Sequence, residues 1–150
     1  MSIYDKVADD IKLAMKARDH VRLETLRAIK KELLEARTAK NAGGVVSEAD
    51  ELKLLQKMVK QRKDAADIFN GQGRADLGDN ELKEAKIISE YLPAMMTPEE
   101  LLKAVKEIIA STGASSMKDM GKVMGAASTA LAGRAEGKEI SRVVKELLSA

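Results

Sequence analysis

The 150-residue sequence contains no cysteine, only two prolines, and only two tyrosines and one phenylalanine as aromatic residues. The lack of cysteine excludes disulfide bonds, thiolate zinc sites and thiol nucleophiles. The lack of aromatic side chains excludes extensive stacking on nucleobases. No apolar run reaches the roughly 18 residues of a membrane-spanning helix, so no membrane association is expected. The first ten residues carry mixed charge, unlike a secretory signal, and we therefore expect a cytoplasmic protein.

Catalytic motifs are also missing. The single histidine, His20, follows a polar segment and is interpreted as a surface residue. No set of nucleophile, base and orienting group can be assembled from the spacing. The segment GKVMG at 121–125 lacks both the G-x-x-x-x-G-K-[ST] spacing and the preceding strand of a nucleotide-binding loop. We predict no metal and no cofactor, and the sequence favours, without deciding it, a protein that is not an enzyme.

The abundant residues Ala, Leu, Lys, Glu and Met all favour helices, and no strand pattern is present. We therefore predict an all-α protein. Four segments begin with Ser or Thr followed three residues later by Asp or Glu, which is typical of the capping box at a helix start. These pairs are Ser2 and Asp5, Ser47 and Asp50, Thr97 and Glu100, and Ser116 and Asp119.

Apolar residues at helical spacing predict helices, with stripes over residues 3–15, 23–34, 52–69, 82–92, 101–109, 117–131 and 143–148. Pro93 should end the fourth of these, because proline disfavours helical geometry in the residue before it, and Thr97 should start the fifth. We therefore predict a long N-terminal helical hairpin over residues 1–95, with its two long arms joined by the AKNAGG turn at 39–44. A compact three-helix bundle should follow over residues 96–150.

Positive charge is unevenly distributed, although the net charge is only +2. Residues 12–40 contain nine Lys or Arg and four Asp or Glu, whereas residues 53–63 contain five Lys or Arg and no acidic residue. Two interpretations stay open. These side chains either solvate long helices, or they contact a phosphate backbone.

The sixth predicted helix carries a strip of small residues on one side. At 100° per residue, the predicted core stripe occupies positions 117, 120, 124, 127 and 131. A second stripe, beside it, has almost no side chains, and two lysines border its outer edge. The small residues are Gly121, Gly125, Ser128 and Ala132, and the lysines are Lys118 and Lys122.

Glycine inside a helix lowers the stability of the helix by about 1 kcal/mol relative to alanine. The strip of small residues therefore needs an explanation. The strip either lets a neighbouring helix approach closely, or it admits a ligand backbone or base with the lysines supplying charge. The segment GRAEGKEIS at 133–141 then places Gly133 at a helix end and Ser141 as a predicted N-cap. Such a turn can offer backbone amides to an anion, although a plain turn is the other interpretation.

Three ordered motifs, EYLPAMMTPEEL at 90–101, DMGKVMG at 119–125 and GRAEGKEIS at 133–141, resemble the signature of the GatB/YqeY family. The N-terminal segments AMKARD and LETLRAIKKEL resemble the free-standing YqeY pattern, so the likeness covers nearly the whole chain. Two departures are visible. Met95 stands where the family often has Gln, and Glu136 stands where it often has Asp.

The resemblance implies a two-part helical protein similar to the tail of the GatB subunit of glutamine-dependent tRNA amidotransferase, which contacts tRNA away from the catalytic centre. It also implies that the amidotransferase chemistry, a carbon–nitrogen ligase reaction, is housed in parts of that enzyme that this chain lacks. The candidate RNA-binding residues are Lys118, Gly121, Lys122, Gly125, Gly133, Arg134, Gly137 and Lys138.

Three functions follow as hypotheses. The first is an accessory protein that binds tRNA by shape and phosphate contacts, using the C-terminal region and the basic hairpin. The second is a protein-interaction module whose small-residue strip receives a partner helix. The third is a non-catalytic subunit of an amidotransferase complex. The sequence identifies neither the RNA nor the protein partner.

Overall fold

The computed structural model describes residues 2–39 and 43–150, and these ranges contain helices and no strands. The all-α prediction is confirmed. The described elements are, in chain order, α1 (Ile3–Ala17), α2 (His20–Thr38), α3 (Glu48–Gly71), α4 (Ala75–Ser89), α5 (Pro98–Thr112), the short 3-10 helix η1 (Met117–Asp119), α6 (Met120–Ala130) and α7 (Gly137–Ser149).

The four hydroxyl residues predicted to start helices do so. Ser2, Ser47 and Thr97 precede α1, α3 and α5, and each side-chain oxygen accepts the backbone N–H three residues later. Ser116 likewise caps η1, with its oxygen accepting the N–H of Lys118. These hydrogen bonds satisfy backbone amides that have no partner within the first turn of a helix.

Three of the described helix starts have no such bond. The residues before α4, α6 and α7, which are Arg74, Asp119 and Glu136, make no side-chain capping hydrogen bond, and α6 continues directly from η1. The prediction that Ser141 is an N-cap is wrong, because α7 begins at Gly137 and Ser141 lies within it. A hydroxyl residue at a plausible position does not by itself fix where a helix begins.

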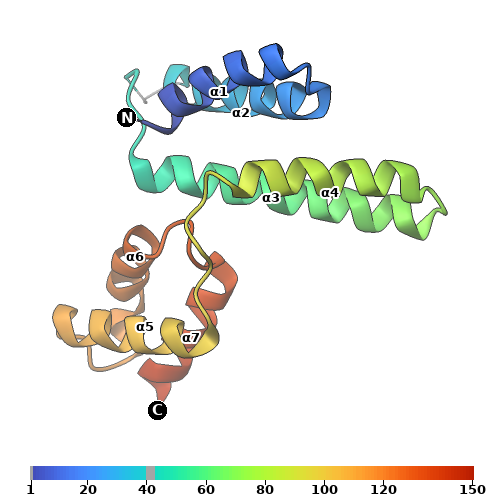
Figure 1. Cartoon of the computed structure of the whole chain (residues 1–150). Helices are drawn as coiled ribbons and strands as arrows, with labels where there is room; N and C mark the ends of the chain where they lie inside the picture. The colour runs from blue at the N-terminus through green and yellow to red at the C-terminus, as the bar shows by residue number, and fades with distance from the viewer. Residues whose placement is uncertain (1, 40–42) are drawn as a thin grey trace. The chain divides into compact units, whose positions relative to one another are not determined.

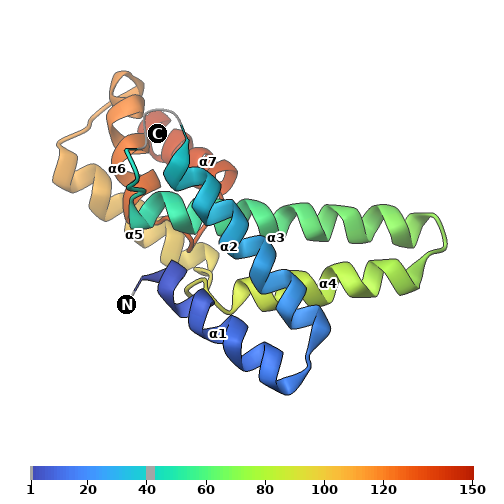
Figure 2. The same cartoon turned by 90° about the horizontal axis from the view of Figure 1, so that it is seen from above.

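The chain divides into two compact units, unit 1 (Met1–Leu92) and unit 2 (Pro93–Ala150). In unit 1, α1 pairs with α2 and α3 pairs with α4, and α2 also packs against α4 (Figures 1 and 2). The turn from α1 to α2 passes through Arg18 at a left-handed φ of 55°. Apolar residues of all four helices form one core: Val7, Ala14, Leu26, Ile29, Leu33, Leu55, Met58, Ile87 and Ile88.

The long hairpin of unit 1 differs from the one we expected. Its arms are α3 and α4, joined by a turn at residues 72–74 (Figure 2). The helices α2 and α3, in contrast, share few contacts. The AKNAGG turn was predicted to join the arms, and its residues 40–42 lie outside the described residues. Apolar stripes show which face of a helix is buried but not which helix covers it, which explains the error.

Gly78 allows α3 and α4 to approach closely. It is buried in α4, and a Cβ at this position would lie 2.2 Å from Oδ1 of Asn70 and 3.2 Å from the carbonyl oxygen of Ala66. The Asn70 side chain could move aside, but the Ala66 carbonyl belongs to the backbone of α3. A side chain at position 78 therefore requires Asn70 to move and the backbone of α3 to shift, and the larger the side chain, the larger the shift.

We expect Gly78→Val to lower the free energy of unfolding by about 1–3 kcal/mol, the usual cost of forcing extra atoms into a packed contact. Urea denaturation followed by circular dichroism measures this. Gly71→Val is the matched control, because a Cβ on Gly71 would meet no atom within 4 Å. Equal stability of the two variants would show that the contact at Gly78 does not hold the hairpin together.

Unit 2 contains α5, η1, α6 and α7 around its own core (Figure 1). Its fully buried side chains include Val105, Val123 and Val144, and the N–H of Met96 ties the segment before α5 to the carbonyl of Arg134 at 2.8 Å. The predicted core stripe of the sixth helix is shifted. Val123 is buried although it was not predicted to be, whereas Met117 lies in η1 and is 41% exposed.

Candidate nucleic-acid interface

The two glycines of α6 lie at the surface of the protein. Both Gly121 and Gly125 are exposed, and a Cβ placed on either would meet no atom within 4 Å. No described helix therefore uses these glycines for close approach. The strip is shorter than predicted, because Ser128 is half-buried and Ala132 is buried and lies beyond the end of α6.

Two lysines border the glycines, as the helical spacing predicts. Lys118 lies in η1 and is exposed. Lys122 is also exposed, and its Nζ donates a hydrogen bond to the carbonyl oxygen of Thr112, the last residue of α5, at 3.0 Å. Its positive charge thereby caps the C-terminal end of a helix. This structural role of Lys122 was not predicted from the sequence.

Asp119 is a carboxylate whose charge interacts with that of Lys122. Its side chain accepts hydrogen bonds from the backbone N–H groups of Ser115 and Ser116, which lower its pKa, and the charge of Lys122 lowers it further. The carboxylate of Asp119 thus binds the backbone that precedes η1. These hydrogen bonds fix the turn into η1, the short helix that carries Lys118.

The remaining candidate residues lie in the turn between α6 and α7. Gly133 is buried with a left-handed φ of 80°, which explains why glycine stands there. The Nη2 atom of Arg134 lies 4.0 Å from Oε2 of Glu100, in the first turn of α5. Gly137 and Lys138 begin α7 and are exposed.

The predicted residues therefore form two groups rather than one cluster. Lys122 contacts the C-terminal end of α5 through Thr112, and Arg134 faces Glu100 at its N-terminal end. These two positions on α5 are separated by about 18 Å at 1.5 Å per residue. A ligand that touches both groups has to be extended, as a nucleic-acid backbone is.

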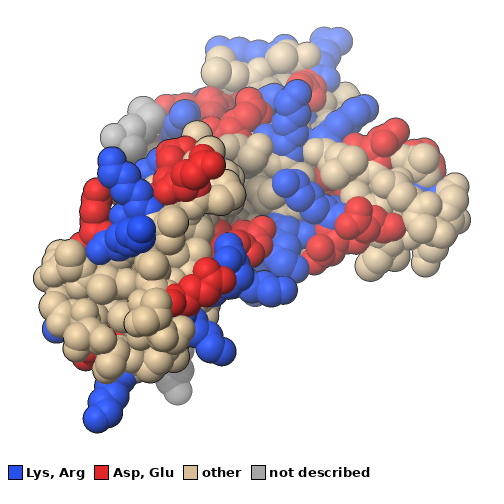
Figure 3. Space-filling view, turned by 90° about the horizontal axis from the view of Figure 1, so that it is seen from below, with Lys and Arg blue, Asp and Glu red and all other residues tan. Residues whose placement is uncertain are grey.

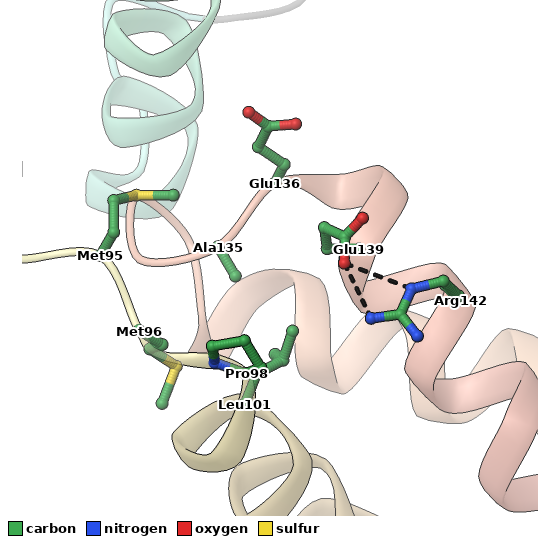
Figure 4. Close-up of a pocket in the computed structure, with 8 residues that line it drawn as sticks. All are labelled: Met95, Met96, Pro98, Leu101, Ala135, Glu136, Glu139 and Arg142. Atoms are coloured by element: carbon green, nitrogen blue, oxygen red, sulfur yellow. Dashed lines mark hydrogen bonds and ion pairs between the residues drawn. The ribbon is translucent and has the colours of Figure 1, made fainter.

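A hollow of about 260 Å³, which the sequence did not reveal, adjoins the second group (Figure 4). Met95, Met96 and Pro98 line it opposite Glu136, Glu139 and Arg142, with Leu101 and Ala135 also contributing. Arg142 donates to Glu139 at 2.9 and 3.2 Å and to Glu146 at 3.0 Å, and these bonds raise its pKa. An apolar wall facing carboxylates does not favour a phosphate, so we assign the hollow no part in nucleic-acid binding.

Potential metal ligands are dispersed over the described residues. His20 is exposed at the first position of α2, as its polar surroundings predicted. In the described part of the chain, no three His, Cys, Asp or Glu side chains are grouped so that they could hold a metal ion.

The fold and this surface define a two-unit helical protein with an exposed small-residue strip and basic residues beside it. The model of the YqeY-like protein family matches residues 4–148. The chain belongs to the YqeY family, as the three sequence motifs indicated.

Two relatives carry the name "Altered inheritance of mitochondria protein 41, mitochondrial". One, from Clavispora lusitaniae (strain ATCC 42720), is 38% identical over 86 residues, which cover 57% of this chain and 49% of that protein. The match thus spans about half the length of this relative. The other, from Pyrenophora tritici-repentis (strain Pt-1C-BFP), is 27% identical over 154 residues, covering 99% of this chain and 82% of that protein.

These names contradict the cytoplasmic location that we expected, because both relatives are described as mitochondrial. The expectation rested on the mixed charge of the first ten residues, which differs from a secretory signal but does not distinguish the cytoplasm from other compartments inside the cell. Within residues 2–39 and 43–150, no helix is long and apolar enough to cross a membrane.

Proposed function

We propose that this YqeY-family protein is a non-catalytic accessory protein that binds RNA of the tRNA class along unit 2. The observation that carries the proposal is the exposed pair Gly121 and Gly125, with open space over both glycines and Lys118 and Lys122 beside them. Double-stranded RNA is recognised largely by shape and by contacts to phosphate and ribose. A helix face without side chains lets an RNA backbone approach closely, and the lysines beside it attract the phosphates.

A row of lysines on α3 supports the same function. Of the five basic residues at 53–63, Lys53, Lys57, Lys60 and Lys63 lie on the exposed side of the helix, and only Arg62 turns inward, 3.7 Å from Glu84. Lys60 is paired with Asp64 at 3.0 Å, whereas among the described residues no carboxylate oxygen lies within 4.0 Å of the Nζ of Lys53, Lys57 or Lys63. These three lysines supply positive charge, which suits a phosphate backbone.

Positive charge is local rather than continuous. On the face drawn in Figure 3, Lys and Arg side chains alternate with Asp and Glu side chains instead of forming one broad positive area. A few phosphate contacts per unit are consistent with this pattern. The likeness of the motifs to the GatB tail further supports tRNA as the RNA, and a supporting position beside an amidotransferase as the setting.

The test reverses charge at two lysines that leave the fold intact. Lys118 and Lys138 are exposed, and within the described residues no carboxylate oxygen lies within 4.0 Å of either Nζ. We expect Lys118→Glu combined with Lys138→Glu to weaken tRNA binding at about 0.1 M salt at least tenfold. The slope of log affinity against log salt should become shallower by about 2, one for each lost phosphate contact.

The matched control is Lys103→Glu combined with Lys106→Glu. Both residues are exposed on α5 and, like the first pair, have no carboxylate partner among the described residues. A filter-binding titration of the two double variants separates a specific surface from overall charge. Equal weakening by both, or a tRNA affinity unchanged by the first, would contradict the proposal.

A further inference from the structure

Unit 1 contains a second hollow, of about 560 Å³, between the start of α2 and the side of α4. Val21 and Ile87 give it an apolar lining, and Arg22, Lys83 and Lys86 give it positive charge. Its volume is in the range of small-molecule sites, which combine an apolar lining with a few polar groups. None of these residues belongs to the surface described in unit 2.

The two carboxylates that line the hollow both face Arg22. Oε2 of Glu90 accepts a hydrogen bond from Nη1 of Arg22 at 2.9 Å, and Oδ2 of Asp19 lies 3.6 Å from Nε. Asp19 also accepts the N–H of Arg22 at 3.1 Å and so caps α2. The bond to Glu90 is the main cause of the raised pKa of Arg22. The three side chains bind one another, although one guanidinium and two carboxylates leave this wall with a net charge of −1.

The two lysines of the hollow are not held by ion pairs as Arg22 is. Lys83 and Lys86 lie three residues apart on α4, which places them on the same side of the helix about one turn apart. Both are exposed, and in the described ranges no carboxylate oxygen comes within 4.0 Å of either Nζ. Like charges at this spacing repel each other, and a ligand carrying two negative charges relieves that repulsion.

We propose that this hollow binds a phosphomonoester, with the phosphate between Lys83 and Lys86 and the apolar part of the ligand against Val21 and Ile87. Lysine is a common phosphate-binding residue because its ammonium acts as a compact charge with several donors. The carboxylates do not offer a metal site, since both are engaged by Arg22. The phosphate can belong to a free mononucleotide or to the 5′ end of an RNA, and the experiment separates these sources.

The experiment uses the full chain labelled with ¹⁵N and titrates it with AMP. We expect amide shifts confined to residues near 19–22 and 83–90, and at least tenfold weaker binding in Lys83→Gln combined with Lys86→Gln. The matched control is Lys103→Gln combined with Lys106→Gln, which removes the same two charges at the same spacing from α5. Thermal melting verifies that each variant is folded.

A second arm compares one short RNA with and without a 5′-phosphate. Tighter binding of the phosphorylated RNA that is lost in the Lys83/Lys86 variant assigns the site to an RNA end, whereas binding of AMP alone assigns it to a free nucleotide. Either result supports the proposal. Absence of both, or equal weakening of AMP binding by the two lysine pairs, overturns it. Lys118→Glu with Lys138→Glu should leave AMP binding unchanged, so this site and the proposed tRNA surface fail independently.

Discussion

Gly125→Leu is expected to weaken tRNA binding by a factor of about 10 to 100, or about 1.4–2.7 kcal/mol, without lowering the stability of the protein. The new side chain would project from the strip and hold a nucleic-acid backbone away from α6. The fold leaves room where this side chain begins, since a Cβ at this position has no atom within 4 Å. Leucine also favours a helix over glycine by about 0.8 kcal/mol, so the melting temperature should stay the same or rise.

Ala130→Leu is the control for this experiment. Ala130 is exposed on the same helix and lies about 140° around its axis from Gly125 at 100° per residue. Equal loss of affinity in both variants would mean that the strip is not the contact surface. The salt dependence separates the alternative function, because a partner helix seated on the strip would be displaced by Gly125→Leu with little effect of salt.

Arg37→Met is expected to lower the free energy of unfolding by about 3 kcal/mol at pH 7. Glu51 is only 6% exposed, and its Oε2 lies 3.6 Å from Nη2 of Arg37. The guanidinium of Arg37 also covers the ring of Tyr4, with Cζ 4.4 Å from the ring centroid. Methionine keeps much of this packing but removes the charge, and a buried carboxylate without its partner destabilises a protein by about 3–5 kcal/mol.

The loss should depend on pH in a defined direction. Burial raises the pKa of Glu51 above the ordinary 4.5, and the charge of Arg37 opposes the rise. Removing Arg37 therefore raises this pKa further. An acid with a higher pKa in the folded state binds its proton more tightly there, so its contribution to stability is present below pH 4.5 and is lost as the pH rises through the folded pKa.

Urea denaturation of wild type and Arg37→Met at pH 7 and near pH 4.5 measures this, and the deficit should be smaller at the lower pH. Adding Glu51→Gln to Arg37→Met should restore much of the stability at pH 7, because the neutral amide needs no counter-charge. A deficit that is the same at both pH values, with no rescue, would assign the loss to the packing of Arg37 on Tyr4 instead.

The presence of most helices could be predicted, because the interactions that start a helix join residues close together in the sequence. Ser47 and Thr97 cap helices through hydrogen bonds to residues three positions away, so the short sequence pattern contains the whole interaction. Where the first turn has no side-chain cap, as before Ala75 and Gly137, the pattern offers nothing and the start was missed or misplaced. The partner of each helix could not be predicted, since the contact of Gly78 with Ala66 joins residues on different helices.

For the candidate site too, features within one helix could be predicted and contacts between helices could not. Periodicity within α6 placed Gly121 and Gly125 on one side, and the structure leaves both exposed. Periodicity could not show that Lys122 bonds to the end of another helix, nor that Arg134 faces Glu100 about 18 Å from it along α5. The hollow at Lys83 and Lys86 was also missed, because its apolar and acidic lining comes partly from α2.

The hydrogen bond from Lys122 to Thr112 lowers the entropy that this lysine loses when it binds a ligand. A free lysine loses about 1.5–2 kcal/mol of rotamer entropy when a ligand immobilises it. Lys122 is already held by one of its three ammonium hydrogens, and two remain available. It is therefore a preorganised cation, and the entropic penalty of fixing it was met when the chain folded.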